Sequence, residues 1–170
     1  MVKHLLQLGA AAVVLGGASC GGDDSSPDGS AARSGGAADA KSMMASNTQR
    51  AAPGLTIKTA ASQFGKALFS KGDRAIYYFD KESTSKPECY GACARAWPPV
   101  LTKGKPKAAG RVKQGLLGTR KRSNGHRQVT YDGHPLYFYV DDPEGEVLCH
   151  NVEEFGGLWL AVKPSGKPVP

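Results

Sequence analysis

The chain contains one internal repeat, and this repeat constrains the fold more than any other feature of the sequence. Tyr77-Tyr78-Phe79 corresponds to Tyr137-Phe138-Tyr139, and each trio closes a predicted hairpin. The copies span about 64–104 and 118–168, and a basic connector, 105–117, joins them. Short repeated units bury a common core only by packing against one another. The other matched positions of the two copies are Cys89 with Cys149 and Trp97 with Trp159.

Turn residues divide both copies into short strands. Asn124-Gly125 and Asp132-Gly133 supply positive φ angles at low cost and define a three-stranded meander. Lys71-Gly72-Asp73-Arg74 is a turn between two strands that should form a hairpin. The predicted strands are 55–59, 67–70, 75–79, 118–122, 128–131, 135–139 and 157–162.

Composition agrees with a mainly β fold. Glycine (22) and proline (11) are frequent in the 170 residues, and aromatic residues make up only 8%. A large aliphatic helical core is therefore not expected. The prediction is two tandem β-hairpin or meander repeats packed into one small domain, 55–170, with a disordered N-terminal tether.

The N-terminus predicts export. Lys3 and His4 precede an apolar run, 5–15, which ends in small residues before Cys20. The run is too short for a permanent membrane span. It resembles a bacterial lipoprotein signal peptide, 1–19, whose cysteine becomes the lipidated first residue of the mature chain. The match departs at Gly17, where leucine is usual, and the alternative is ordinary secretion with cleavage near 18–19.

Residues 20–54 are interpreted as the lipidated Cys20 and a disordered linker. After Cys20 this segment has no aromatic residue and no Val, Ile or Leu. It cannot bury enough apolar surface to offset the entropy of ordering its backbone. The expected location is therefore the cell envelope, with the folded part on the extracytoplasmic face of a bacterial membrane.

The motifs of the folded part resemble the bacterial secreted-repeat lipoproteins of unknown function, which carry a Tyr-x-(Phe/Trp/Tyr)-x-x-Asp motif. Residues 137–142 fit this motif fully, and residues 77–82 fit it with Glu82 in place of aspartate. The Cys-rich run 89–99 and the run 155–159 are also similar. The resemblance implies an exported, usually lipid-anchored, mostly β repeat protein without an established reaction. The motif positions are Tyr77, Phe79, Glu82, Tyr137, Tyr139 and Asp142, with Trp97 and Trp159.

Three cysteines of the folded part carry the main chemical question. In an oxidising compartment Cys89, Cys93 and Cys149 tend to form disulfides, and with Cys20 lipidated their number is odd. Cys89–Cys93 would close a very small loop, whereas a bridge from either cysteine to Cys149 would join the two repeats. The alternative is a copper, zinc or electron-transfer site made by these three residues with His150.

The aromatic and acidic motif residues have a structural interpretation. Tyr77 and Phe79, like Tyr137 and Tyr139, are two residues apart, so each pair lies on one face of its strand. With both tryptophans they are expected to form the core and the contact between the repeats. Four carboxylates are read as turn residues after a strand, with a cation site or a catalytic pair as the alternative: Asp80, Glu82, Asp141 and Asp142.

The net charge of +7 resides entirely in 55–170, because positive and negative charges balance in 1–54. In an envelope protein such a surface favours anionic headgroups or cell-wall polymers over nucleic acid, and the alternative is a solvated basic face without a partner. Residues 89–131 contain no carboxylate and ten cations: Arg95, Lys103, Lys105, Lys107, Arg111, Lys113, Arg120, Lys121, Arg122 and Arg127.

The sequence contains no nucleophile elbow, phosphate loop or dinucleotide fingerprint. We therefore expect no cofactor and no enzymatic activity. The leading hypothesis is a membrane-anchored envelope lipoprotein that acts as a binding or interaction module. The alternative hypothesis is a redox or metal-handling envelope protein that uses Cys89, Cys93 and Cys149.

Overall fold

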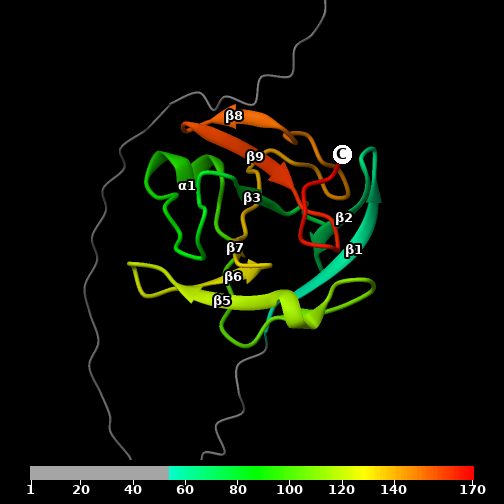
Figure 1. Cartoon of the computed structure of the whole chain (residues 1–170), viewed down its shortest axis with the longest axis horizontal. Helices are drawn as coiled ribbons and strands as arrows, with labels where there is room; N and C mark the ends of the chain where they lie inside the picture. Colours follow the sequence, from blue (N-terminus) through cyan, green and yellow to red (C-terminus); the bar gives the residue numbers. More distant parts are fainter. Residues whose placement is uncertain (1–53) are drawn as a thin grey trace, which may run out of the picture.

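The structure, a computed structural model, describes residues 54–170 (Figure 1). The expectations for the signal peptide, for lipidation of Cys20 and for the linker up to residue 53 therefore lie outside the described residues. No helix within 54–170 has the length and the hydropathy that a membrane crossing requires.

The described residues form a mainly β fold of three small sheets and one short α-helix, as the sequence predicts. The sheets have strand orders β2-β1-β4, β3-β9-β8 and β5-β6-β7. The elements in chain order are β1 Thr56–Ser62, β2 Gly65–Ser70, β3 Tyr77–Phe79, α1 Ala92–Ala96, β4 Lys107–Ala108, the 3₁₀ turn η1 Gln114–Leu116, β5 Leu117–Lys121, β6 Arg127–Tyr131, β7 His134–Pro135, β8 Val152–Glu154 and β9 Gly157–Ala161.

The first sheet joins the start of the folded part to the connector between the repeats. β1 and β2 form an antiparallel hairpin, and β1 also pairs with β4 in parallel, with Thr56 opposite Lys107. Gly54 lies so close to the carbonyl oxygen of Lys105 that a Cβ atom there would be only 1.7 Å from it. A residue with a side chain would therefore push the two segments apart.

The third sheet is the predicted meander of β5, β6 and β7. Asp132 and Gly133 both have positive φ angles, of 48° and 84°, as the turn between β6 and β7 requires. In the other predicted turn, Asn124-Gly125, only Gly125 has a positive φ angle. The longer loop 122–126 explains this difference, because it closes with a hydrogen bond from Arg122 N–H to the His126 carbonyl.

The second sheet combines the two copies of the repeat, because β3 pairs with β9 and β9 pairs with β8. The predicted hairpin of β2 and β3 is therefore only partly correct. Its turn exists, with a bridge between Phe69 and Ala75, but the two strands then enter different sheets. Local turn residues indicate where the chain reverses, and the partners of β3 lie far along the chain.

Two hydrophobic clusters form the core, and alternate residues of the same strands belong to different clusters. Phe69, Tyr77 and Tyr137 belong to the first cluster, whereas their neighbours Leu68, Ile76 and Leu136 belong to the second. The strands β2 and β3 are therefore buried on both faces. This explains why residues 75–79 are a continuous apolar run rather than an alternating one.

Four elements were not predicted from the sequence, and two of them, β4 and η1, lie in the connector. Residues 92–96, inside the cysteine-rich run, form the helix α1, and residues 152–154 form the edge strand β8. The helix begins after Gly91, whose φ angle of 58° turns the chain. It has only five residues, which is too short for a helical period to be visible in the sequence.

Candidate functional site

The two copies of the repeat meet at Tyr77 and Tyr137. These residues form an isolated antiparallel bridge in which each backbone N–H donates to the carbonyl oxygen of the other, both at 2.9 Å. Both tyrosines are fully buried. Because equivalent residues of the two copies contact one another, the repeats are related here by an approximate two-fold axis.

The tyrosine hydroxyl groups extend this reciprocal contact. The Tyr77 hydroxyl donates to Oδ2 of Asp142 at 2.7 Å, and the Tyr137 hydroxyl donates to Oε1 of Glu82 at 2.6 Å. Each leading tyrosine therefore binds the carboxylate that ends the motif of the other copy. We call these two contacts the tyrosine–carboxylate pairs.

Each carboxylate also holds the loop that follows it. Oε1 of Glu82 accepts hydrogen bonds from the backbone N–H groups of Glu88 at 2.6 Å and Cys89 at 3.1 Å. Oδ1 of Asp142 accepts one from Leu148 at 3.1 Å. The carboxylates thus connect the turn after each motif to the cysteine-containing loop; Glu82 is buried and Asp142 is half-buried.

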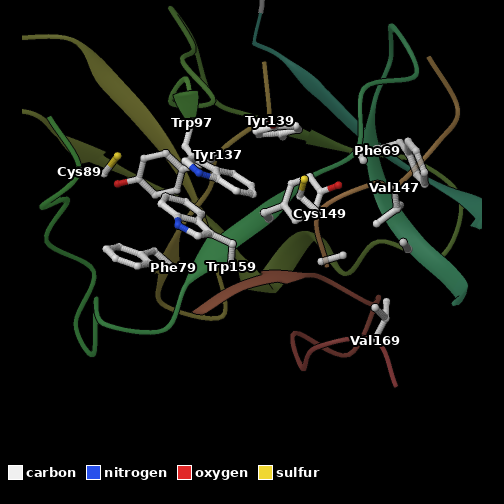
Figure 2. Packing of buried hydrophobic residues seen from close by; sticks show 14 of the residues in the cluster. Phe69, Phe79, Cys89, Trp97, Tyr137, Tyr139, Val147, Cys149, Trp159 and Val169 are labelled. Atoms are coloured by element: carbon white, nitrogen blue, oxygen red, sulfur yellow. The ribbon is translucent and has the colours of Figure 1, made fainter. Parts of the chain in front are cut away.

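The motif aromatics form one continuous stack between the copies, the aromatic stack, which consists of Phe79, Trp159, Trp97 and Tyr139 (Figure 2). The two tryptophan rings are nearly parallel, with an interplanar angle of 4° and a centroid distance of 4.0 Å. Phe79 stacks on Trp159 at 4.4 Å, and Tyr139 lies 4.8 Å from Trp97. Each outer ring therefore contacts the tryptophan of the other copy.

The leading tyrosines meet the same stack edge-on. Tyr77 contacts Trp97 at 5.2 Å, and Tyr137 contacts Trp159 at 5.3 Å, both with nearly perpendicular rings. The indole N–H of Trp97 donates to the Glu154 carboxylate at 2.7 Å. These arrangements confirm the expectation that the aromatic residues form the core and the contact between the repeats.

Burial dominates the electrostatics of the tyrosine–carboxylate pairs. Desolvation raises the pKa of Glu82 and of Asp142, although the hydrogen bonds from Tyr137 and Tyr77 act in the opposite direction. Burial, reinforced by the neighbouring carboxylate, also raises the pKa of each of these two tyrosines well above its ordinary value. The hydroxyl groups therefore remain neutral donors at physiological pH.

Arg122 is the one buried member of the ten cations between residues 89 and 131, with 3% of its surface exposed. Its guanidinium lies 4.1 Å from the ring centroid of Tyr90 and donates to Oε1 of Gln128 and to the carbonyl of Cys89. Its positive charge partly offsets the desolvation of Glu82. Arg122 thus belongs to the interior network and is not available to an external anion.

Cys89 and Cys93 form a disulfide with a Cα–Cα distance of 5.4 Å. While this bond exists, neither sulfur is a thiolate that could bind a metal ion. Cys149 is fully buried in the first cluster, and residues 54–170 contain no free cysteine. Within the same residues, no three or more His, Cys, Asp or Glu side chains are arranged to hold a metal ion.

His150, the fourth member of the predicted alternative metal set, has a structural contact. Its Nδ1 accepts a hydrogen bond from the backbone N–H of Ala161 at 3.2 Å, and its ring lies edge-on to Phe64. Burial lowers its pKa. The neutral ring therefore acts as an acceptor that ties the loop after Cys149 to β9.

Two of the four motif carboxylates have a role that differs from the predicted one of turn residues. Asp80 and Asp141 are exposed after their strands, as expected for turn residues, and Asp80 accepts a hydrogen bond from Leu158 N–H at 2.6 Å. Glu82 and Asp142 instead cross to the other copy. A signal for this was present, since each acid follows its leading tyrosine at the same offset of five residues.

The comparisons with known proteins give one finding. A search of curated proteins and a search of solved structures each returned no match. Residues 118–163 include β6 to β9 and most of β5, and they cover most of the second copy of the repeat. This segment, which contains Tyr137, Asp142 and Trp159, matches the model of a lipoprotein family that is described as a secreted repeat of unknown function.

Proposed function

We propose that the protein is a lipoprotein anchored through Cys20 on the extracytoplasmic face of a bacterial membrane, and that its folded part is a binding module rather than an enzyme. One observation carries the second half of this proposal. The motif side chains with reactive groups contact one another between the two copies, through a buried pair, Tyr137 with Glu82, and a partly buried pair, Tyr77 with Asp142.

The match of residues 118–163 to a secreted repeat supports export. Support for the anchor comes from the sequence, in which a charged start, an apolar run and small residues precede Cys20. A diacyl or triacyl anchor would hold the protein firmly, because two or more acyl chains suffice for stable membrane attachment. Groups that act on a partner must then come from the exposed surface of the folded part.

Metabolic labelling with a fatty acid tests the anchor. The full-length chain should incorporate label and fractionate with membranes, and Cys20→Ala should abolish both. Ser26→Ala, a change in the same segment that leaves the cysteine intact, is the matched control and should retain both. Undiminished labelling of the Cys20→Ala chain would contradict the anchor.

A separate measurement tests the claim of a binding module. Tyr137→Phe should leave partner binding unchanged at temperatures where the variant is folded, because the hydroxyl group serves only the interior. If Tyr137→Phe abolished turnover of a substrate while the fold and the midpoint of unfolding were retained, the protein would instead be an enzyme.

A further inference from the structure

The start of the folded part lies next to a surface rich in unpaired cations. The N–H of Leu55 donates to Oγ1 of Thr102 at 3.1 Å, and the N–H of Lys107 donates to the carbonyl of Leu55 at 2.9 Å. The connector is therefore fastened to the residues through which the chain enters the domain. Figure 1 shows this entry, at the first residues of β1, on the same side of the molecule as β5.

The buried Thr102, three residues before the connector, joins the β5–β6 hairpin to the start of the folded part. The backbone N–H of this residue donates to the carbonyl of Arg127 at 2.9 Å, while its hydroxyl oxygen accepts from Leu55. Lys121 lies directly opposite Arg127 in the antiparallel register. We define the cationic surface as Lys103, Lys105, Lys107, Arg111, Lys113, Lys121 and Arg127, all of which are exposed.

The charges of this surface are not balanced within the described residues. The ion pair that the structure contains in 54–170, Lys58 with Asp73, involves none of these seven side chains. Lys121 and Arg127 are like charges on opposing strands, an arrangement that opposes pairing of the strands. An external anion would relieve this repulsion.

We infer that the cationic surface lies against the anionic headgroups of the membrane in which the chain is anchored. This inference rests on the proposed anchor, because the anchor brings the entry point of the domain, and with it this surface, towards the bilayer. Each Lys or Arg near an anionic membrane surface strengthens binding, and the attraction decays within about a Debye length of 10 Å. The interaction orients the domain so that β8 and β9, on the other side in Figure 1, face away from the membrane.

Binding to vesicles without the lipid anchor tests the surface by itself. The probe is the exported chain with Cys20→Ala, and the vesicles contain phosphatidylcholine with or without phosphatidylglycerol. We expect binding only to vesicles with phosphatidylglycerol, and weaker binding as salt is added. Absence of binding to both kinds of vesicle at low salt would overturn the inference.

Two matched triple variants separate this surface from net charge. Lys103→Gln, Lys105→Gln and Lys107→Gln together should weaken binding by roughly tenfold to a hundredfold. Lys66→Gln, Lys81→Gln and Arg95→Gln remove the same charge elsewhere: Lys66 follows the turn of the β1–β2 hairpin, at the opposite end of β1 from Lys107, and Arg95 is on α1. In this control, the logarithm of the vesicle-binding constant should fall by less than about a third of the decrease seen in the first triple variant.

Equal losses in the two triple variants would overturn the assignment to the cationic surface. Binding to poly(glycerol phosphate) without binding to the vesicles would assign the surface to a wall polymer and would also overturn the inference. Neither result would affect the anchor, because fatty-acid labelling of Cys20 is a separate measurement. Failure of the anchor and failure of this surface are therefore distinguishable.

Discussion

Tyr77 and Tyr137 place hydroxyl groups in the interior, where each meets a carboxylate from the other copy of the repeat. Removing one partner of such a contact costs free energy, because a buried carboxylate that loses a donor is left with uncompensated desolvation. The motif can therefore be explained without a substrate. Its tyrosine and its acid are the two halves of a contact that needs both copies.

Removal of one hydroxyl group should destabilise the fold. Tyr137→Phe leaves Oε1 of Glu82 without its tyrosine donor, and we expect a loss of about 1–3 kcal/mol in the free energy of unfolding. Tyr77→Phe should behave in the same way through Asp142. Chemical denaturation followed by tryptophan fluorescence measures both variants.

The control for these variants is Tyr78→Phe. Tyr78 is also buried, but within 54–170 its hydroxyl group makes no side-chain hydrogen bond, and its ring stacks on His134. Tyr78→Phe should lower the free energy of unfolding by less than about 0.5 kcal/mol. Equal losses in Tyr78→Phe and Tyr137→Phe would contradict the role given to the tyrosine–carboxylate pairs.

The raised pKa values of Glu82 and Asp142 predict a pH dependence. Their ordinary values are 4.5 and 3.8, so in the window above these values the folded state binds more protons than the unfolded state. Their contribution to stability is therefore fully present below these ordinary values, and it is lost as the pH rises through the raised folded values. Denaturation curves between mildly acid and neutral pH measure this decline.

The variants Glu82→Gln and Asp142→Asn isolate this dependence, because neither replacement titrates. Together they should flatten the decline in the free energy of unfolding with rising pH. Asp80→Asn, at an exposed carboxylate, is the control and should keep the wild-type slope. A wild-type slope in the double variant would show that other groups cause the pH dependence.

At the scale of elements, the sequence predicted the strands that depend on local turns and missed the elements that depend on distant contacts. Asp132-Gly133 identified the meander because its backbone geometry is a property of those residues. Pairing of β3 with β9 joins Tyr77 to Ala161, far along the chain, and no local pattern encodes it. The helix α1 was missed for a different reason: its closing hydrogen bond, from Trp97 N–H to the Cys93 carbonyl at 2.7 Å, is local, and its five residues are too few to show a helical period.

The disulfide at α1 should contribute modestly to stability. Cys89 and Cys93 are four residues apart, so the bond closes a very small loop and removes little entropy from the unfolded chain. Cys89→Ser with Cys93→Ser should lower the free energy of unfolding by about 2 kcal/mol. Thermal unfolding of this double variant, compared with the unreduced wild-type protein, measures the effect.

Trp97→Phe provides a comparison at the same element that leaves the disulfide in place. It removes part of the aromatic stack and the hydrogen bond to Glu154, and it should cost more, about 3 kcal/mol. If the double cysteine variant were unfolded while Trp97→Phe remained folded, the disulfide would be the main constraint on the first copy.

At the scale of the whole molecule, the two copies form one structural unit. The sheet β3-β9-β8 takes strands from both copies, and the aromatic stack alternates between them. The sequence predicted that the copies pack together, since short repeats need neighbours. It did not predict that each leading tyrosine contacts the carboxylate of the other copy, because the two-fold relation between the copies appears only in the three-dimensional structure.

A single copy should therefore not fold alone. A fragment of residues 105–170 contains Tyr137 and Trp159 but lacks Glu82, Phe79 and Trp97, and we expect it to be unfolded by circular dichroism and by amide chemical-shift dispersion. An equimolar mixture with a fragment of residues 54–104 should recover structure. A cooperative thermal transition in the 105–170 fragment alone would contradict this prediction.

The reciprocal contact at Tyr77 and Tyr137 has the geometry of an isologous dimer interface, in which the same surface of each partner meets its own copy. A tandem chain fulfils this requirement within one polypeptide, at an effective concentration that no free monomer reaches. A protein with only one such repeat would satisfy the same tyrosine and carboxylate groups by forming a homodimer. Duplication of the repeat in one gene would then convert a dimer that depends on concentration into a monomer that does not.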